Sequence, residues 1–461
     1  MYNRLKVIAK NVFSFNAHLS LRVMLVVAVG FVGQVMMSAP ASATLGSASV
    51  QPLVSTVSNT GEVDVAFTPV NNIRGDYKIR ITFAAGFDVS GANSGTCPTL
   101  ATTYITSVSG QIVTLSGQVN NVAGGITPHY CTIQGIKNPS YAQTTASSPL
   151  AILNVSNGVW DSGTAPGVVI TAGALTGVDV QPASLAAGTS GTVAVTFTNP
   201  HGIPPAGVVA VAFPAGFIVG GAFGGTCTGM NGTFSTLNGG QVVYIVRNGT
   251  TTSTSALQSC SVSGITNPSY ADAFGTYTVS TQIASGGANI DTATAASDTI
   301  TAGTLVSTNV EPPSLFAGAV GTSTISFTTA NPIPATGKIL VTFPSGYILT
   351  GVNVGSCSTT MDGTFSVAVT GQVITITRAG GTIEPVGPQT CAIGRTVNPG
   401  VSGSTGVYDI TTKNASNQFI DQDAAVAADT ISSGTISGTS VTPASLAIKR
   451  CSFSRFLDCL A

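Results

Sequence analysis

The chain has little charge. Only 7% of its 461 residues are Asp, Glu, Lys or Arg, and the 16 basic residues nearly balance the 17 acidic ones. A nucleic-acid-binding domain carries a basic patch, and this composition offers none. Disorder needs low hydrophobicity and high charge, whereas 43% of this chain is hydrophobic. We therefore predict a folded protein that does not bind nucleic acid and that is kept in solution by Ser, Thr and Asn.

Groups for acid–base catalysis are also scarce. Glu62, Glu311 and Glu384 are the only glutamates, and the chain has three histidines. His129 and His201 stand at unrelated places, so no Ser-His-Asp set or histidine metal site recurs, and we expect both to be loop residues. There is no Gly-x-Ser-x-Gly elbow and no phosphate-binding loop. These absences predict a protein that is not an enzyme and that needs no cofactor or metal.

Exposed aromatic platforms, which carbohydrate-binding domains usually present, are nearly missing. Trp160 is the one tryptophan. Tyr141 and Tyr270, each after Asn-Pro-Ser, are the candidates for ligand contact, since Tyr can bury one face and keep its hydroxyl in water. The third copy of the repeat has Val401 at this register. Packing within a turn is the alternative interpretation of both tyrosines.

One apolar run stands out, and it lies near the N-terminus at residues 23–37. Four basic residues and no acidic one precede it, and the small residues 38–43 follow it. Its length falls short of the roughly 20 residues that span a bilayer. This pattern is typical of a secretory signal. We predict that residues 1–43 are a signal peptide, that the mature chain has no membrane span, and that it is secreted or held at the cell surface.

The rest of the chain repeats itself with a period of about 130 residues. Phe67, Phe197 and Phe327 follow this interval, as do Phe83, Phe213 and Phe343. An array of like domains is expected from such a chain, and each copy is long enough for its own core. The predicted domains are repeat 1 at 44–173, repeat 2 at 174–303, repeat 3 at 304–434, and an aborted fourth repeat with an aberrant tail at 435–461.

The fourth copy opens correctly and then loses the pattern. Thr442-Pro443-Ala444-Ser445-Leu446 matches the opening of repeat 2, but the residues after Ala447 do not continue it. We interpret this as a frameshift or premature stop, with a natural tail as the alternative. On the first interpretation, Cys451 and Cys459 have no designed partners.

Within each repeat, short alternating segments predict strands. Residues 193–197 alternate large apolar with small or polar side chains, and residues 208–213 form a β-branched run. Asn238-Gly239-Gly240 predicts a hairpin turn, because Asn-Gly supplies the positive φ angles of a tight turn. The spacing of turn residues predicts an all-β antiparallel sandwich of about seven to nine strands per repeat, without an amphipathic helix. The Thr-rich joints are short, which predicts a rod-like array.

Each repeat contains one pair of cysteines, and the spacing within the pair is nearly constant from copy to copy. Paired cysteines in an exported chain are most simply disulfides. A zinc site would need closely spaced Cys or His clusters, which the sequence lacks. The predicted bonds join Cys97 to Cys131, Cys227 to Cys260, and Cys357 to Cys391.

Acidic residues gather near the ends of the repeats. Several carboxylates at a domain joint could bind calcium, but the spacing is not that of a known calcium loop. We therefore expect solvated charges. The residues concerned are Asp161, Asp291, Asp298, Asp421, Asp423 and Asp429.

The third copy supports a resemblance to a known family. Phe327-x3-Asn331-Pro332-Ile333-Pro334, followed by Gly337, residues 339–343 and Pro344-Ser345-Gly346-Tyr347, resembles the tandem immunoglobulin-like repeats of large bacterial surface proteins. The resemblance covers about residues 46–434 and departs from antibody domains, which place a tryptophan between the paired cysteines.

That resemblance implies Ig-like sandwiches in a structural or adhesive array of the adhesin or surface-layer type. The alternative is a set of carbohydrate- or matrix-binding modules that use the loops at the sandwich ends. The partners implied are surface glycans, matrix proteins or like repeats. Fold alone does not choose between these functions.

Overall fold

The computed structural model describes residues 42–100, 104–117, 121–357 and 361–434, together with 438 and 440–442. The predicted signal peptide and most of the predicted fourth repeat, including Cys451 and Cys459, lie outside the described residues. The chain divides into two compact units. The first holds Met1–Pro139 and Thr144–Ile170, and the second holds Ser140–Gln143 and Thr171–Ala461. The first unit contains most of repeat 1, and the second contains residues 140–143 and 171–173 of repeat 1 together with repeats 2 and 3.

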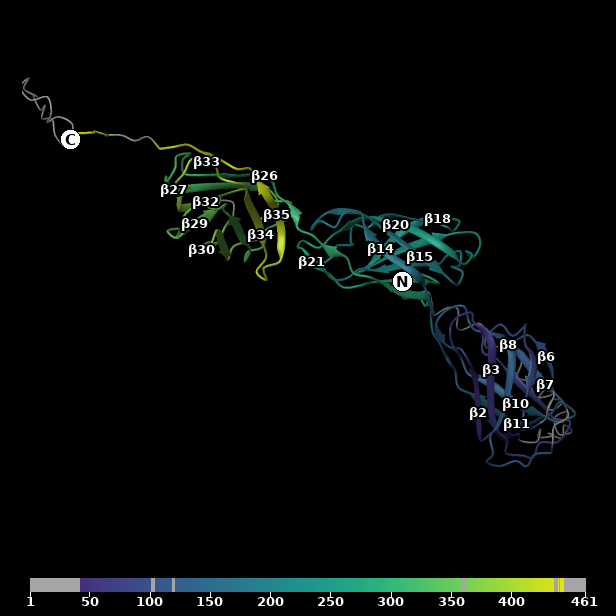
Figure 1. The fold of residues 1–461 in the computed structure, drawn as a ribbon. Coiled ribbons are helices and arrows are strands. Elements are labelled where there is room, and N and C mark those ends of the chain that lie inside the picture. The colour runs from purple at the N-terminus through teal and green to yellow at the C-terminus, as the bar shows by residue number, and fades with distance from the viewer. Residues whose placement is uncertain are drawn as a thin grey trace, which may run out of the picture. The chain divides into compact units, whose positions relative to one another are not determined.

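Repeat 1 is built from three sheets (Figure 1). The six-stranded sheet has the order β1 (Ala43–Thr44), β11 (Val159–Ala165), β10 (Ser148–Leu153), β4 (Lys78–Thr82), β7 (Ile112–Ser116), β6 (Ile105–Ser109). The four-stranded sheet has the order β2 (Ser47–Pro52), β3 (Thr60–Thr68), β8 (His129–Lys137), β5 (Asn93–Thr96). The third sheet pairs β12 (Val169–Ile170) with β9 (Gln143–Thr144).

Repeat 2 has the same three sheets in the same order. The six-stranded sheet runs β13 (Gly173–Ala174), β23 (Asn289–Ala295), β22 (Tyr277–Gln282), β16 (Val208–Ala212), β19 (Val242–Asn248), β18 (Thr233–Gly239). The four-stranded sheet runs β14 (Thr176–Pro182), β15 (Ser190–Asn199), β20 (Ala256–Thr266), β17 (Phe223–Thr228). The third sheet pairs β21 (Asp272–Ala273) with β24 (Thr299–Ile300).

Repeat 3 follows this order once more. The six-stranded sheet runs β25 (Gly303–Thr304), β35 (Phe419–Val426), β34 (Tyr408–Lys413), β28 (Lys338–Thr342), β31 (Val373–Ala379), β30 (Thr364–Thr370). The four-stranded sheet runs β26 (Val306–Glu311), β27 (Val320–Thr328), β32 (Pro388–Val397), β29 (Val354–Cys357). The third sheet pairs β33 (Gly403–Ser404) with β36 (Thr430–Ile431).

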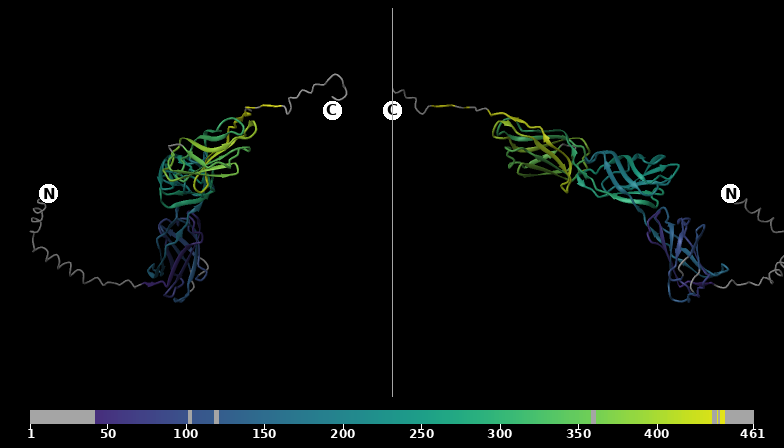
Figure 2. Two further views of the ribbon diagram at one scale, coloured as in Figure 1. Left: turned by 90° about the vertical axis from the view of Figure 1, so that its left-hand side faces the viewer. Right: turned by 45° about the vertical axis from the view of Figure 1, so that its right-hand side comes forward.

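The larger two sheets of each repeat form the two layers of a sandwich (Figure 2). Nearly all strand pairs are antiparallel; the exception in each repeat is the two-residue strand by which the chain enters, which pairs in parallel with its neighbour. The prediction of tandem antiparallel Ig-like β-sandwiches is therefore confirmed. Within the described residues, each repeat has nine strands of four or more residues and three of two residues. The rod-like arrangement stays a prediction.

Period-two alternation decides which side chains fill the core. In β15, Val193, Val195 and Phe197 are exposed by 1% or less, whereas the residues between them face outward. Val209 and Val211 of β16 approach from the opposite sheet and join the same cluster. Repeat 3 has a corresponding cluster around Phe327. The described residues form no helix that is long and apolar enough to cross a membrane.

The hairpin of β18 and β19 forms as predicted, but at a different turn. Gly239 pairs with Val242, so the turn residues are Gly240 and Gln241, and Asn238 lies in the strand. Gly240 has a φ of +62°, a conformation that glycine adopts without steric cost. The same conformation recurs at Gly110 and Gly371, with φ of +58° and +59°.

Candidate functional site: the joint between consecutive repeats

A fully buried aspartate recurs at the same position of every repeat. Asp161 in β11, Asp291 in β23 and Asp421 in β35 are all 0% exposed. Each pairs with the first residue of the two-residue strand by which the chain enters its repeat. The expectation of solvated charges at the repeat ends is therefore wrong for these three residues. A buried carboxylate needs hydrogen-bond donors, and the neighbouring loop supplies them.

In repeat 3, the loop after β27 provides three donors to Asp421. The main-chain N–H groups of Ala330 and Asn331 donate to Oδ2 at 3.0 and 2.9 Å, and Asn331 Nδ2 donates to Oδ1 at 2.7 Å. Burial raises the pKa of the Asp421 carboxyl, although these donors act in the opposite direction. Asn331 is itself only 2% exposed.

Repeat 1 contains the same arrangement. The N–H groups of Val70 and Asn71 donate to Asp161 Oδ2 at 2.9 and 3.0 Å, and Asn71 Nδ2 donates to Oδ1 at 2.6 Å. Asn71 differs from Asn331 in one respect, because it is half-exposed. The Asn–Asp pair thus forms without a cover over the asparagine.

Repeat 2 has a histidine where the others have asparagine. His201 N donates to Asp291 Oδ2 at 3.3 Å, and its Nδ1 lies 2.6 Å from Oδ1. An ionised carboxylate only accepts, so the proton lies on Nδ1. His201 occupies a loop, as expected, but it is equivalent to Asn71 and Asn331, which sequence reasoning missed. The three positions are spaced by the period of the repeat, and this was the signal that could have found them.

The asparagine of repeat 3 also binds repeat 2, within the second unit. Asn331 Nδ2 donates to the carbonyl oxygen of Ala187 at 3.1 Å. Beside this bond, Gly188 has a φ of +66°, and a Cβ added there would lie 1.6 Å from Asn331 Oδ1. Only glycine allows the two loops to approach this closely. The joint is therefore shaped by residues of both repeats.

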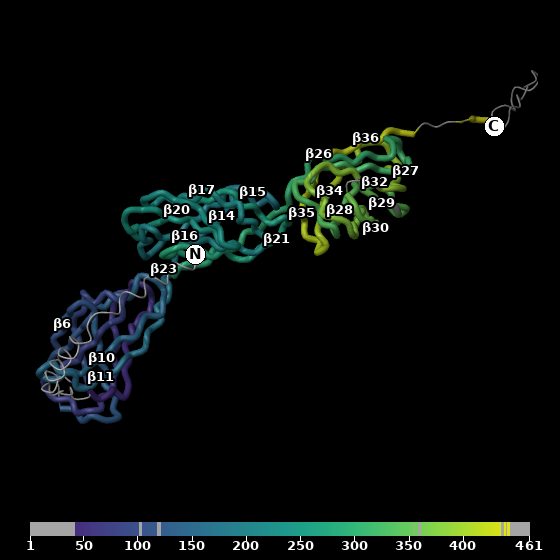
Figure 3. Tube along the Cα trace, turned by 180° about the vertical axis from the view of Figure 1, so that it is seen from behind, coloured from purple at the N-terminus to yellow at the C-terminus, as the bar shows by residue number. Residues whose placement is uncertain are grey.

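A second set of contacts lies where β21 of repeat 2 and β35 of repeat 3 begin, two strands that are neighbours in Figure 3. Ala271 N donates to the carbonyl oxygen of Phe419 at 2.7 Å, and the side chain of Gln418 donates to Asp272. The corresponding bond one repeat earlier, from Ala142 N to Asn289 O at 2.8 Å, also lies within the second unit. The same main-chain contact is therefore used twice.

A buried asparagine holds the loop of repeat 2 that meets repeat 3. Asn267 Nδ2 donates to the carbonyl oxygens of Ser184 and Ala186 at 2.7 and 2.9 Å, and its N–H donates to Thr189 O at 3.0 Å. These bonds fix residues 184–189, which include Ala187 and Gly188. Asn138 and Asn398 make the same bonds in repeats 1 and 3. The Asn-Pro turn is thus a clamp for the joint loop.

Each candidate ligand-binding tyrosine directly precedes a residue that bonds to the next repeat, Ala142 or Ala271. Tyr270 is half-buried, its ring centroid is 5.3 Å from that of Phe274, and the next residue is Ala271 of the joint. Tyr141 is also half-buried and directly precedes Ala142. Val401, at the same register in repeat 3, is 76% exposed. A role of these tyrosines in ligand binding stays a prediction.

The structure bonds the three cysteine pairs as the spacing predicts: Cys97 to Cys131, Cys227 to Cys260 and Cys357 to Cys391. In repeats 2 and 3 the bonded cysteines lie directly opposite each other on neighbouring strands of the four-stranded sheet, and in repeat 1 Cys97 directly follows the corresponding strand, β5. The bond therefore fastens the edge strand to its neighbour and does not connect the two sheets. Closing a loop of this size stabilises a domain by roughly 3–4 kcal/mol in the chain-entropy model.

His129, Asp298 and Asp429 lie in or beside the cores of their repeats. His129 is not a loop residue: it begins β8, is 3% exposed, and has its pKa lowered by burial. Asp298 and Asp429 are half-buried and accept hydrogen bonds from Tyr277 and Tyr408 at 2.8 and 2.7 Å. Among the described residues, no three His, Cys, Asp or Glu side chains are grouped to hold a metal ion.

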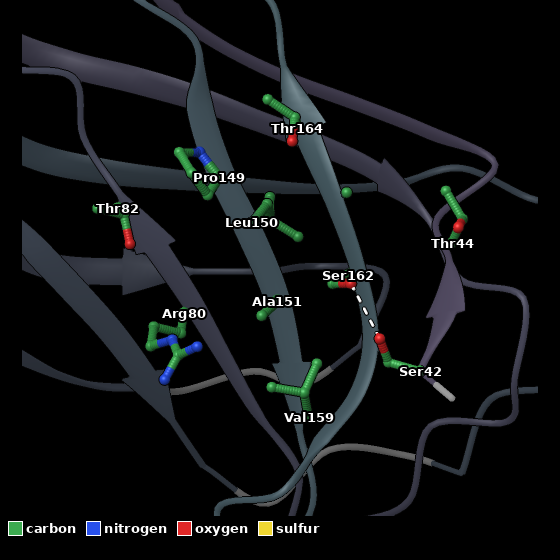
Figure 4. A pocket seen from close by; sticks show the side chains of 11 residues that line it. Ser42, Thr44, Arg80, Thr82, Pro149, Leu150, Ala151, Val159, Ser162 and Thr164 are labelled. Carbon is green, nitrogen blue, oxygen red and sulfur yellow. Dashed lines mark hydrogen bonds between the residues drawn. The ribbon is translucent and has the colours of Figure 1, made fainter. Parts of the chain in front are cut away.

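A hollow of about 690 Å³ lies on the outer face of the six-stranded sheet of repeat 1 (Figure 4). Arg80 is its one charged lining residue, and Ser42 at its rim is 3.2 Å from Ser162, hydroxyl to hydroxyl. Repeats 2 and 3 have Ala210 and Leu340 in place of Arg80. The charge that lines this hollow is therefore not repeated along the chain.

No protein-family model matches the chain, and no curated protein matches it in sequence. Among solved structures, the chain is similar to the FdeC adhesin of Escherichia coli, with 14% identity, 84% of this chain and 99% of that one covered, and a TM-score of 0.19. It is also similar to the N-terminal domain of the Streptococcus gordonii adhesin Sgo0707, with 9% identity, 86% and 94% coverage, and a TM-score of 0.23. A third similar structure is a membrane-anchored protein of Corynebacterium diphtheriae, with 12% identity, 84% of this chain and 91% of that one covered, and a TM-score of 0.20. Similarity this low concerns the fold alone and carries no functional argument.

Proposed function

We propose that the chain is an exported repeat protein of the cell surface that acts as a structural and adhesive array. The observation that carries the proposal is the joint between repeats 2 and 3. It combines the Asn331–Ala187 bond, the Ala271–Phe419 bond and the close approach at Gly188. A flexible string of independent domains needs none of these contacts, because relative motion is the default for linked domains unless an interface holds them together.

Two further features fit this function. The edge strand of each four-stranded sheet is fastened by a disulfide, which suits an oxidising environment outside the cytoplasm. Among the described residues, the buried titratable groups serve the joint or the core, and no cluster of them converges in a cleft as an acid–base catalyst requires. Both features support a scaffold rather than an enzyme.

The test is small-angle X-ray scattering of the oxidised full chain and of its Gly188→Ala variant. We expect the added methyl group to separate the loops at the joint and to broaden the distribution of particle dimensions. Gly240→Ala is the matched control, because Gly240 has a similar φ of +62° but open space around a Cβ. Equal scattering from all three proteins would contradict a structural role of the joint.

Binding of the full chain to arrays of glycans and matrix proteins tests the adhesive part. Saturable binding that is lost in Tyr141→Ala and Tyr270→Ala would favour the alternative, a set of ligand-binding modules. Binding that survives both substitutions would place adhesion elsewhere on the array.

A further inference from the structure

The end of repeat 3 that corresponds to the joint surface of repeat 2 is exposed. Leu315, Phe316 and Val401 are 44%, 54% and 76% exposed. Their counterparts in repeat 2 are half-buried: Leu185, Ala186 and Tyr270. Leu185 and Leu315 are the same residue in equivalent loops, and among the described residues only the loop of Leu185 contacts a following repeat.

This exposed end already has the conformation used in the joint. Asn398 Nδ2 donates to the carbonyl oxygens of Ser314 and Phe316, as Asn267 does in repeat 2. Gly318 has a φ of +69°, close to the +66° of Gly188. A Cβ added at Gly318 would meet nothing within 4 Å, whereas one at Gly188 would meet Asn331. The docking loop is thus preformed, and no described residue fills the place that Asn331 takes at Gly188.

A site complementary to this end exists on the same chain, in repeat 1. Asn71 and Asp161 reproduce the hydrogen bonds of Asn331 and Asp421. Asn71 is half-exposed, whereas Asn331 is 2% exposed beneath repeat 2. Its amide carries a second hydrogen, which at Asn331 donates to Ala187. Val70 and Val159 beside it are 49% and 38% exposed, which offers an apolar surface.

We infer that the exposed end of repeat 3 binds the Asn71–Asp161 site of a second copy of this chain, in a head-to-tail contact. This inference rests on the proposed function and names one partner for it. The joint supplies the geometry: Asn71 Nδ2 of one copy donates to Ala317 O of the other, and Ser402 N donates to Val159 O. A head-to-tail contact of this kind does not close on itself and generates an open chain of molecules.

The contact between copies is weaker than the joint within a chain. Within a chain, the short connection between repeats holds both surfaces at an effective concentration in the millimolar range. Separate molecules lack this connection, so the contact forms at the high local concentration that a crowded cell surface provides. Dilute solutions of the chain contain monomers.

The experiment is sedimentation velocity of the oxidised full chain over a concentration series from about 10 µM to about 1 mM. We expect the average mass to rise with concentration. Gly318→Ala places a methyl group where Asn71 of the second copy must sit and raises the dissociation constant at least about tenfold. Asn71→Ala keeps the two main-chain bonds to Asp161 but removes the amide donor, and has the same effect. Gly371→Ala is the control, since its φ of +59° and open surroundings match those of Gly318.

Association that is lost in Gly318→Ala and Asn71→Ala but kept in Gly371→Ala supports the inference. Association that persists in both variants would overturn it, because another surface would then join the copies. A chain that stays monomeric to the highest concentration would also overturn it, and would mean that residues after Gly434 or another partner cover this end. None of these outcomes depends on the glycan and matrix arrays, so the adhesive proposal stands or fails separately.

Discussion

Repeats 2 and 3 bury the same aspartate against different donors. Asp421 accepts two main-chain N–H bonds and one amide bond, from Ala330 and Asn331. Asp291 faces Pro200 at the position of Ala330, and proline has no N–H. One main-chain donor is therefore missing in repeat 2. His201 stands there instead of an asparagine, and its ring donates at 2.6 Å.

In these two repeats, the residue that faces the carboxylate differs together with the residue before it in the loop: Pro200 precedes His201, and Ala330 precedes Asn331. Where the main chain gives two donors, a neutral amide completes the set and keeps a second hydrogen for Ala187 of the preceding repeat. Where a proline removes a donor, the histidine ring faces the carboxylate and donates from Nδ1 at 2.6 Å. Each variant satisfies the buried carboxylate, but only the asparagine also spans the joint by an amide hydrogen bond.

The largest effect is expected from removing the side-chain donor in each repeat. His201→Leu leaves Asp291 with one main-chain donor, and breaking a buried pair in this way costs about 3–5 kcal/mol. Asn331→Leu leaves Asp421 with two donors and costs about 1.5–3 kcal/mol. Hydrogen exchange of the amides in β23 and β35 reads the stability of the two repeats separately. Equal losses of stability in the two repeats would show that the main-chain donor missing at Pro200 has no effect on how much the side-chain donor contributes.

The next effect concerns the glycines of the joint loop. Gly188→Ala and Gly318→Ala both place alanine at a left-handed φ, which costs roughly 1–2 kcal/mol. Only the first substitution also drives a Cβ into Asn331, which adds about 1–3 kcal/mol of overpacking. The stability loss is measured by unfolding in denaturant, followed by hydrogen exchange. Amides of repeat 2 report on Gly188→Ala, and amides of repeat 3 report on Gly318→Ala. An equal loss of stability in Gly188→Ala and Gly318→Ala would mean that the two loops of the joint move apart without a free-energy cost.

The sequence was sufficient to predict the sandwich, because its information is local. Alternation in residues 193–197 and the turn residues between segments determine strands and faces, and the period of the repeat determines the number of domains. The hairpin shows the limit of such reasoning. Asn238-Gly239 is a strong turn signal, yet pairing of β18 with β19 continues through it, and Gly240 forms the turn.

The joint could not be predicted, because its parts are far apart in the sequence and chemically ordinary. Asp421 lies 90 residues from Asn331, and Ala187 lies 144 residues from it. An isolated Asp near a repeat end is usually solvated, so composition gave the wrong expectation. Comparing the three copies position by position would have shown that position 161 and its equivalents are always Asp, while position 71 and its equivalents are Asn, His and Asn. The burial of these aspartates depends on how the strands and loops pack, and the pattern of residue types along the sequence does not contain that information.

A smaller effect concerns acidity. Burial raises the pKa of Asp421 and Asp429 in repeat 3 and of Asp298 in repeat 2 above the usual 3.8. A carboxyl with a raised folded-state pKa binds a proton more readily in the folded chain, so its contribution to stability appears as the pH falls through that pKa and is absent at neutral pH. We expect these groups to stabilise repeat 3 more than repeat 2 as the pH falls from 7 towards 4.

The check is the midpoint of thermal unfolding of the full chain against pH, compared with Asp429→Asn. Asparagine keeps an oxygen for the Tyr408 hydroxyl but cannot titrate, so the variant gains less stability on acidification than the parent. Asp88→Asn is a suitable control, because the pKa of this exposed carboxyl is lowered by its bonds to Ser90 and its contribution has the opposite sign. Parallel curves for the parent and Asp429→Asn would remove this carboxyl from the pH dependence.

The smallest difference lies in one hydroxyl group of the core. Tyr347 and Tyr408 are 2.6 Å apart, oxygen to oxygen, and Tyr408 donates to Asp429 at 2.7 Å, so the Tyr347 hydroxyl donates to Tyr408. Repeat 2 has Phe217 at the position of Tyr347 and keeps only the bond from Tyr277 to Asp298. Tyr347→Phe therefore converts this part of repeat 3 into its counterpart.

The expected loss is about 0.5–1.5 kcal/mol, because the ring stays in place and the Tyr408 hydroxyl loses one neutral hydrogen bond while it keeps its bond to the carboxylate. Tyr408→Phe is the informative comparison, since it removes the donor to Asp429 and is expected to cost more. Hydrogen exchange in β34 measures both. Equal losses would mean that the two hydroxyl groups stabilise repeat 3 cooperatively. The single bond from Tyr277 to Asp298 would then be expected to stabilise repeat 2 less.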